Sequence, residues 1–362
     1  LPEYRATRAD AGDFLSLCYN SELAEEVTLQ PIRRYGMDAA ILFADILLLP
    51  QALGQHVAFK AGEGPVLDAL SGSSAVARLQ REGIHDTLAP IYDTVSRLSR
   101  SLPDDVALIG FAGAPWTVAT YMVEGGGSKD YATTKAWAFS DADDFQALID
   151  LLTESTADYL IEQIKAGAEA IQIFDTWAGA LPAVQMRRWC LEPLKRIRER
   201  IAEAYPDVPV IGFPRGIGTE LVTAAKTTGV DALSIDWAMD VEWVRDNVQP
   251  LVTVQGNLDP RAVVVGGRHM REGAAHVLDT LAPAGNFIFN LGHGFVPETP
   301  PEHVAEATGA AVFCIYFGLV LGPLFFGFTA EILGYDFAFT CMAVITAIGS
   351  ICVFWPMKRK AD

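Results

Sequence analysis

Ala39-Ala40-Ile41-Leu42-Phe43-Ala44-Asp45-Ile46-Leu47 is a run of apolar side chains interrupted by one carboxylate. A β-strand that is buried on both faces has such a continuous hydrophobic sequence. An ionised side chain in this setting costs free energy unless a partner compensates its charge. Asp45 is therefore either a helix cap or satisfied buried acid, or a functional carboxylate at the carboxyl end of a parallel strand.

Apolar stretches that end in polar or glycine residues recur along the chain. After residues 39–45, we predict six more strands at 106–111, 170–174, 208–213, 232–235, 251–254 and 287–289. Helical patterns separate most of them, including 21–36, 87–102 and 142–165. This alternation predicts parallel strands with right-handed crossovers. The expected fold is α/β, a (β/α)8 TIM-type barrel that lacks its first strand, and the repetition favours a functional Asp45.

Charge and cysteine content restrict the partners. The formal net charge is -18, and residues 309–362 contribute three basic and three acidic side chains, so the excess lies before them. An acidic protein is a poor ligand for nucleic acid, and an anionic substrate would need a local cationic pocket. The five cysteines show no C-x-x-C spacing, which argues against a disulfide framework or a structural zinc site and suits a reducing compartment.

The C-terminal region has a different composition. Residues 309–330 and 337–356 are apolar runs of about 20 residues, enough to span a bilayer. They are too long and apolar for ordinary core helices, and Gly318-x-x-x-Gly322 suits close helix packing. Lys358-Arg359-Lys360 would place the C-terminus in the cytoplasm. We therefore predict two domains, 1–306 for the barrel and 307–362 for two transmembrane-like helices.

An ordered set of motifs resembles one family, the uroporphyrinogen decarboxylases of haem biosynthesis. The resemblance covers roughly residues 1 to 306 and rests on Leu1-Pro2-Glu3-Tyr4-Arg5, Phe43-Ala44-Asp45-Ile46-Leu47, Pro115-Trp116-Thr117, Tyr121-Met122-Val123-Glu124-Gly125-Gly126-Gly127-Ser128, Phe174-Asp175-Thr176-Trp177, Gln255-Gly256-Asn257 and Asn290-Leu291-Gly292-His293-Gly294.

The resemblance implies an activity and a set of site residues. The family converts uroporphyrinogen III to coproporphyrinogen III by removing four acetate carboxylates, without a metal or other cofactor, as a cytoplasmic homodimer. Asp45 matches the carboxylate that stabilises the protonated pyrrole. Tyr121 and Thr176 match positions that hydrogen-bond substrate carboxylates or orient the pocket, and Tyr121 with Asp45 forms the expected catalytic pair. His293 matches a histidine that contacts a substrate carboxylate, and Phe174 would pack against the macrocycle.

The same sequence positions differ in how easily an ordinary structural role would explain them. Tyr121 could be a half-buried tyrosine, and Thr176 could cap a following helix. His293 lies between two glycines, which would let the backbone approach a ligand. Other strand-end residues have less specific roles, as a source of local positive charge or as supporting acids: Arg215, Asp175 and Asp236. The remaining histidines are interpreted as surface or structural: His56, His85, His269, His276 and His303.

Two departures from the family bear on function. The family carries Arg-Gln-Ala-Gly-Arg just before the Leu-Pro-Glu-Tyr run, but this sequence begins at Leu1, so we expect weak substrate binding and doubtful activity. The second departure is the tail, in which Gly322-Pro323 and Glu331-x-x-Gly334-Tyr335 resemble the last two helices of a major facilitator superfamily transporter. We interpret it as foreign sequence joined near Glu306, by genomic fusion or by an assembly error.

Two alternative functions compete with the decarboxylase function. A corrinoid-dependent methyltransferase on the same barrel would need a zinc thiolate site, typically one histidine with two cysteines, and only Cys18 and Cys190 lie in the barrel. The other is a membrane-tethered, non-catalytic fusion protein. The favoured partner is a small-molecule tetrapyrrole, with no nucleic acid and with membrane contact only through the tail.

Overall fold

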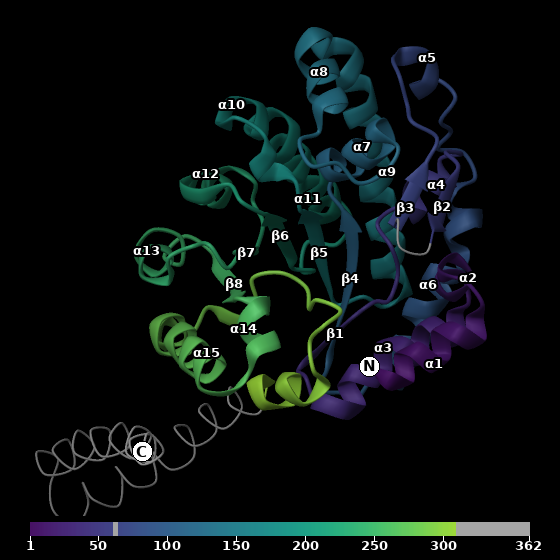
Figure 1. The fold of residues 1–362 in the computed structure, drawn as a ribbon. Coiled ribbons are helices and arrows are strands. Elements are labelled where there is room, and N and C mark those ends of the chain that lie inside the picture. The colour runs from purple at the N-terminus through teal and green to yellow at the C-terminus, as the bar shows by residue number, and fades with distance from the viewer. Residues whose placement is uncertain (61–63, 309–362) are drawn as a thin grey trace, which may run out of the picture. The chain divides into compact units, whose positions relative to one another are not determined.

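A seven-stranded parallel sheet forms the centre of the molecule. The computed structural model describes residues 1–60 and 64–308, and Leu1–Ala305 form one compact unit. The strands pair in sequence order (Figure 1): β1 (Ala39–Ile41), β4 (Ala107–Gly113), β5 (Ala170–Asp175), β6 (Val210–Pro214), β7 (Ala232–Ser234), β8 (Thr253–Leu258) and β9 (Phe287–Leu291). All seven predicted strands are confirmed.

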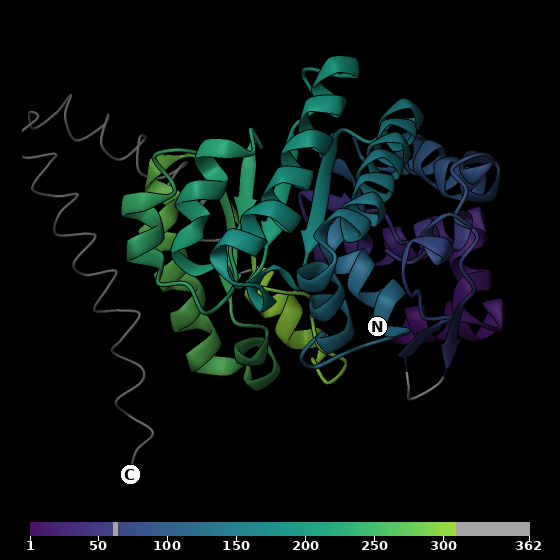
Figure 2. The same ribbon diagram turned by 90° about the horizontal axis from the view of Figure 1, so that it is seen from above.

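Helices cover the outer face of this sheet (Figures 1 and 2). Neighbouring helices of the outer layer pack on one another: α3 (Ser21–Tyr35), α6 (Ile84–Ser101), α9 (Ala142–Ala166) and α11 (Glu192–Ala204). Asn20 caps α3 by accepting hydrogen bonds from the Glu22 and Leu23 N–H groups, and Gly36 ends it in the left-handed region at φ 60°. The other helices are α1 (Pro2–Ala11), α2 (Phe14–Tyr19), α4 (Leu48–Ala52), α5 (Ser73–Val76), α7 (Pro115–Glu124), α8 (Ala132–Ser140), α10 (Ala183–Met186), α12 (Leu221–Thr227), α13 (Val241–Asn247), α14 (Pro260–Val265) and α15 (Gly267–Leu281).

The first strand is shorter than predicted. The Leu42 backbone N–H still donates to the Ile109 carbonyl, but the Phe43 N–H donates to the Thr28 hydroxyl of α3 at 3.0 Å. This contact takes the chain away from the sheet after Ile41. Asp45 consequently lies in the loop between β1 and α4 rather than within the strand.

A two-stranded antiparallel sheet was not predicted. It pairs β2 (Val57–Lys60) with β3 (Gly64–Leu67), which contains Gly64 and Pro65. The Leu67 N–H donates to the Gly125 carbonyl at 3.0 Å, and a Cβ on Gly126 would lie 2.9 Å from the Pro65 carbonyl oxygen. Gly125 and Gly126 therefore lie against β3.

The sheet is an incomplete barrel within the described residues, because β1 and β9 are its two edges and are not paired with each other. After β9 the chain (yellow in Figure 1) returns past α14, where Glu298 lies 3.7 Å from Arg261 and His303 Nδ1 lies 2.9 Å from the Val263 carbonyl. His303 is thus structural, as expected.

No helix in the described part of the chain is both long and apolar enough to cross a membrane. The two predicted spans, 309–330 and 337–356, lie outside the described residues.

Candidate active site

The predicted site residues follow different strands but share one end of the sheet. Because the strands are parallel, the loops after β1, β4, β5, β6, β7 and β9 meet at their carboxyl ends, where barrel enzymes bind substrates. The side chains placed there are Asp45, Tyr121, Phe174, Thr176, Arg215, Asp236 and His293.

Asp45 is a carboxylate with little compensation. Its Oδ1 accepts the Leu47 N–H at 2.8 Å, which fixes the turn before α4. Because α4 begins after Leu47 without a side-chain cap, Asp45 is not a helix cap. Its second oxygen accepts no hydrogen bond from the described residues, and no cation pairs with it there. Burial raises the pKa of Asp45 to about 6, against the smaller effect of the Leu47 hydrogen bond. The carboxylate can therefore accept hydrogen bonds from a ligand that carries N–H groups or positive charge.

Tyr121 lies on α7 near Asp45. Burial raises the pKa of Tyr121, and the negative charge of Asp45 raises it further. Its ring centroid is 6.4 Å from that of Trp177. The ring centroid of Tyr131, just before α8, is 5.4 Å from that of Trp177. Both tyrosines remain neutral at pH 7, so Tyr121 can donate a hydrogen bond to an acidic ligand.

A row of rings joins Phe174 to His293. The Phe174 ring lies 6.2 Å from Phe213, Phe213 lies 6.4 Å from His293, and His293 lies 6.1 Å from Trp237. The rings come from β5, β6 and the loops after β9 and β7. They form an apolar wall against which a flat ligand can stack.

His293 acts as a neutral ring in this arrangement. Its Nδ1 accepts the Gly294 N–H at 2.6 Å, so the proton of the neutral imidazole resides on Nε2. Burial and the positive charge of Arg215 lower the pKa of His293, while Asp236 opposes them. A Cβ on Gly292 would collide with the Trp237 backbone, so packing requires this glycine, whereas Gly294 has open space beside it and the expected approach of its backbone to a ligand stays a prediction.

Thr176 does not cap a helix. Its half-buried hydroxyl makes no hydrogen bond within the described residues, and the following 3-10 turn has no side-chain cap. A different hydroxyl, that of Thr117, holds this loop. It donates to Asp175 Oδ1 at 2.6 Å and accepts the Trp177 N–H at 3.1 Å. Burial raises the pKa of Asp175 to about 6, despite hydrogen bonds from Thr117 and Cys190. Asp175 thus supports the Trp177 loop through Thr117.

Asp236 has a similar supporting role. Its Oδ2 accepts the Gly216 N–H and its Oδ1 accepts the Ala238 N–H, at 2.8 and 2.9 Å. These bonds tie the loop after β6 to the loop after β7. Trp177 and Trp237 were not predicted as site residues, although the acid-then-tryptophan pattern at two strand ends was a usable signal.

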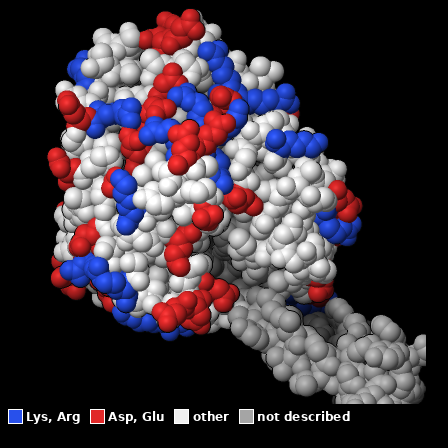
Figure 3. Space-filling model, turned by 180° about the vertical axis from the view of Figure 1, so that it is seen from behind, with Lys and Arg blue, Asp and Glu red and all other residues white. Residues whose placement is uncertain are grey.

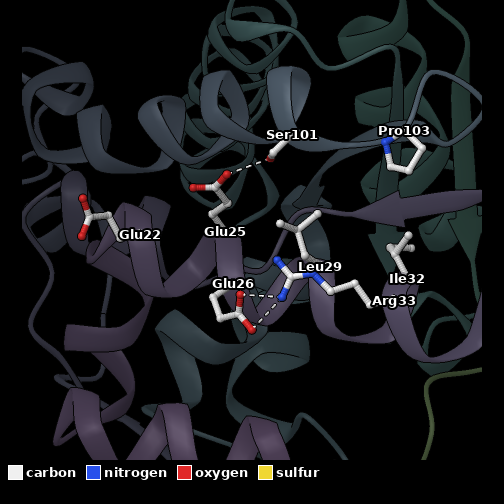
Figure 4. Close-up of a pocket in the computed structure, with 8 residues that line it drawn as sticks. All are labelled: Glu22, Glu25, Glu26, Leu29, Ile32, Arg33, Ser101 and Pro103. Carbon is white, nitrogen blue, oxygen red and sulfur yellow. Dashed lines mark hydrogen bonds and ion pairs between the residues drawn. The ribbon is translucent and has the colours of Figure 1, made fainter.

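One pocket of the molecule lies away from these strand ends. A cavity of about 470 Å³ lies between α3 and α6, lined by Glu22, Glu25, Glu26, Leu29, Ile32, Arg33, Ser101 and Pro103 (Figure 4). Ser101 and Pro103 precede β4, which places the cavity at the amino ends of the strands. Its charges are already paired, Glu26 with Arg33 and Glu25 with Ser101 and Arg97. It is not the candidate site.

The rear face carries interspersed charges of both signs rather than one basic area (Figure 3). Between α9 and α11, Arg196 pairs with Asp150 and Glu154, and Arg200 pairs with Glu154 and Asp158. These cations are neutralised within the fold, so they do not attract an anionic substrate.

No group of three His, Cys, Asp or Glu side chains suited to a metal occurs among the described residues. Cys18 and Cys190 are both buried, and burial raises the pKa of each thiol. The Cys190 thiol hydrogen-bonds Asp175. Both cysteines are thus packed as structural side chains.

A parallel-stranded barrel with a desolvated carboxylate and an aromatic wall at its strand ends belongs to the class of α/β-barrel enzymes. The sequence model described as "Uroporphyrinogen decarboxylase (URO-D)" matches residues 1–312, and the chain belongs to this family. A uroporphyrinogen decarboxylase of Rhodospirillum rubrum is 56% identical over 306 residues, covering 84% of this chain and 88% of that protein. One of Paracoccus denitrificans is 52% identical over 307 residues, covering 84% and 90%.

Solved structures support the fold alone. A methyltransferase from Methanosarcina mazei has a TM-score of 0.67 at 18% identity and covers 86% of this chain and 90% of its own. A B12-independent methionine synthase from Shewanella has a TM-score of 0.57 at 9% identity, covering 83% and 88%. The methyltransferase alternative is not favoured, because sequence identity near one half links the chain to the decarboxylases.

Proposed function

We propose that this chain decarboxylates the four acetate side chains of uroporphyrinogen III and releases coproporphyrinogen III. Family membership over residues 1–312 supports the reaction. The observation that carries the chemistry is Asp45, a desolvated carboxylate with one backbone hydrogen bond and no cationic partner in the described residues.

Asp45 would stabilise the charge that forms during the reaction. Protonation of a pyrrole ring carbon makes the ring an electron sink. The bond from the acetate methylene to its carboxylate then breaks, the electron pair flows into the ring and CO2 leaves. A proton taken up by the methylene carbon and loss of the ring proton restore the pyrrole and leave a methyl group. A fixed anion near the ring favours the cationic intermediate and accepts the pyrrole N–H groups.

The other predicted residues would position the substrate. Tyr121 and the Nε2–H of His293 are neutral donors suited to substrate carboxylates. Phe174 lies in the ring wall against which the macrocycle would pack. Thr176 has a hydroxyl without a hydrogen-bond partner in the described residues, which leaves it available to a ligand.

The test is anaerobic incubation of the full chain with uroporphyrinogen III, followed by oxidation and chromatography of the porphyrins. The sequence alone predicts a doubtful activity because it begins at Leu1, but family membership over residues 1–312 leads us to expect turnover by the wild type, with hepta-, hexa- and pentacarboxylate intermediates and then coproporphyrin. Asp45→Asn should form them on the order of 100- to 1000-fold more slowly. Equal product formation by the wild type and Asp45→Asn would remove Asp45 from the mechanism. No product from the wild type would contradict the proposed function.

The dimeric state, the cytoplasmic location and the foreign, transporter-like origin of residues 307–362 stay predictions. Family resemblance supports the first two, and the apolar sequence after residue 308 supports the third. Sedimentation equilibrium tests the dimer, cell fractionation tests the location, and sequencing the native locus across the junction near Glu306 tests the origin.

A further inference from the structure

Arg215 lies over the rings of two tryptophans at the carboxyl end of β6. Its guanidinium carbon lies 4.8 Å from the Trp237 ring centroid and 6.0 Å from the Trp177 centroid. Its backbone is fixed as well, because its N–H donates to the Asp175 carbonyl at 3.1 Å and its carbonyl accepts the Gly179 N–H at 2.9 Å. The side chain is half-buried, and its position is set by two loops.

The charge of Arg215 has no anionic partner in residues 1–60 and 64–308. No carboxylate oxygen there lies within the 4.0 Å of an ion pair. The nearby acids have other partners, since Asp175 accepts from Thr117 and both oxygens of Asp236 accept backbone N–H groups. By contrast, the helix arginines Arg187, Arg196 and Arg200 all pair with acids. A half-buried cation without an anion is expected to gain one from a ligand.

From this geometry we infer that Arg215 binds one peripheral carboxylate of the tetrapyrrole substrate, with Trp177 and Trp237 holding the guanidinium. The inference rests on the proposed function. Indole rings cover the faces of a guanidinium and leave its N–H edge available, and that edge matches a carboxylate with two parallel hydrogen bonds.

His293 provides a second, different donor beside this cation. Trp237 contacts both Arg215 and His293, whose neutral ring presents Nε2–H. Arg215 would therefore bind one acidic side chain of the substrate as a cation, and His293 would bind another as a neutral hydrogen-bond donor. In a protein with a formal net charge of -18, such a local cation is what an octacarboxylate requires.

The test measures uroporphyrin binding by the full chain through quenching of tryptophan fluorescence. The variant Arg215→Met keeps the length of the side chain and removes its charge. Arg188→Met is the matched control, because Arg188 also stacks on a tryptophan, at 4.2 Å from the Trp189 centroid, but lies outside the site. Both variants change the net charge equally.

We expect Arg215→Met to weaken uroporphyrin binding at least tenfold, Arg215→Lys to weaken it about threefold, and Arg188→Met to change it less than twofold. In turnover, Arg215→Met should raise KM more than it lowers kcat. NMR titration should show a higher His293 pKa in Arg215→Met alone, which a loss of packing elsewhere would not produce. Arg215→Gln, with circular dichroism of every variant, covers the case in which the Met variant does not fold.

Binding by Arg215→Met and Arg215→Gln within twofold of Arg188→Met would overturn the inference while leaving the proposed function intact. A wild type that binds no porphyrin would instead contradict the proposed function, and this inference with it.

Discussion

At the scale of single residues, Asp45 combines a functional advantage with a cost in stability. Burial raises its pKa to about 6, so the folded chain holds the proton more tightly than the unfolded chain does. The protonated form therefore stabilises the fold at low pH, and that contribution is lost as the pH rises through 6. Above this value the ionised group opposes folding, while its charge is what the proposed reaction needs.

Asp45→Asn should separate these two effects. We expect a rate loss on the order of 100- to 1000-fold, because one preorganised electrostatic group is removed. We also expect a free energy of unfolding about 1 to 3 kcal/mol higher at pH 8, with no gain near pH 3. Urea unfolding at both pH values measures this, with Asp38→Asn, an exposed acid before the same strand, as the control. Lower stability at pH 8 would show that the Leu47 hydrogen bond outweighs burial.

The pH dependence of activity should follow the same group. If ionised Asp45 is required, kcat/KM rises with pH and levels off above about 6. Asp175 titrates in the same range, so the profile alone does not identify the group. Loss of this limb from the residual activity of Asp45→Asn, but not from that of Asp175→Asn, would assign it to Asp45. An unchanged limb in Asp45→Asn would exclude that assignment.

Tyr121→Phe and His293→Asn each remove one hydrogen-bond donor expected to meet a charged group. Each should cost roughly 1 to 3 kcal/mol of transition-state stabilisation, about 5- to 150-fold in kcat/KM. His85→Asn serves as the control, since His85 contacts Tyr92 on α6, away from the site. Full activity in both site variants would identify them as structural residues.

At the scale of elements, the hydrogen bonds of Thr117 connect α7 to the loop after β5. Thr117→Val should destabilise the fold by about 1 to 3 kcal/mol, because it leaves the buried Asp175 and the Trp177 N–H without their partner. Thr120→Val on the same helix removes a hydroxyl that only donates to the Thr117 carbonyl, and should cost less. Chemical denaturation compares the two, and a larger loss in Thr120→Val would contradict this account.

The sequence predicted elements whose signal is local. Each of the seven strands is an apolar run, and Asn20 and Gly36 mark the ends of α3. The β2–β3 pair was missed because β3 is anchored by Gly125, far along the chain. The placement of Arg215 against Trp177 and Trp237, and the hydrogen bonds of Thr117, were not predicted, because residues from separate strand ends meet there only in the folded chain.

At the scale of the whole molecule, the described chain has a self-contained core. Leu1–Ala305 form one compact unit, and residues 307–362 add no net charge. We therefore expect the chain trimmed after Glu306 to keep its circular dichroism spectrum and to unfold cooperatively, with a free energy of unfolding within about 0.5 kcal/mol of the full chain. Its solubility without detergent should equal or exceed that of the full chain, because two long apolar runs are removed.

The matched control is a chain trimmed after Leu281. It lacks β9, which pairs with β8 from Val254↔Phe287 to Leu258↔Leu291, and with it His293. This deletion exposes the edge of β8 and removes one end of the ring wall, so we expect aggregation and no uroporphyrin binding. If trimming after Glu306 gave the same aggregation, residues 307–362 would be part of the folding unit, and the division of the chain into a barrel and a separate tail would be wrong.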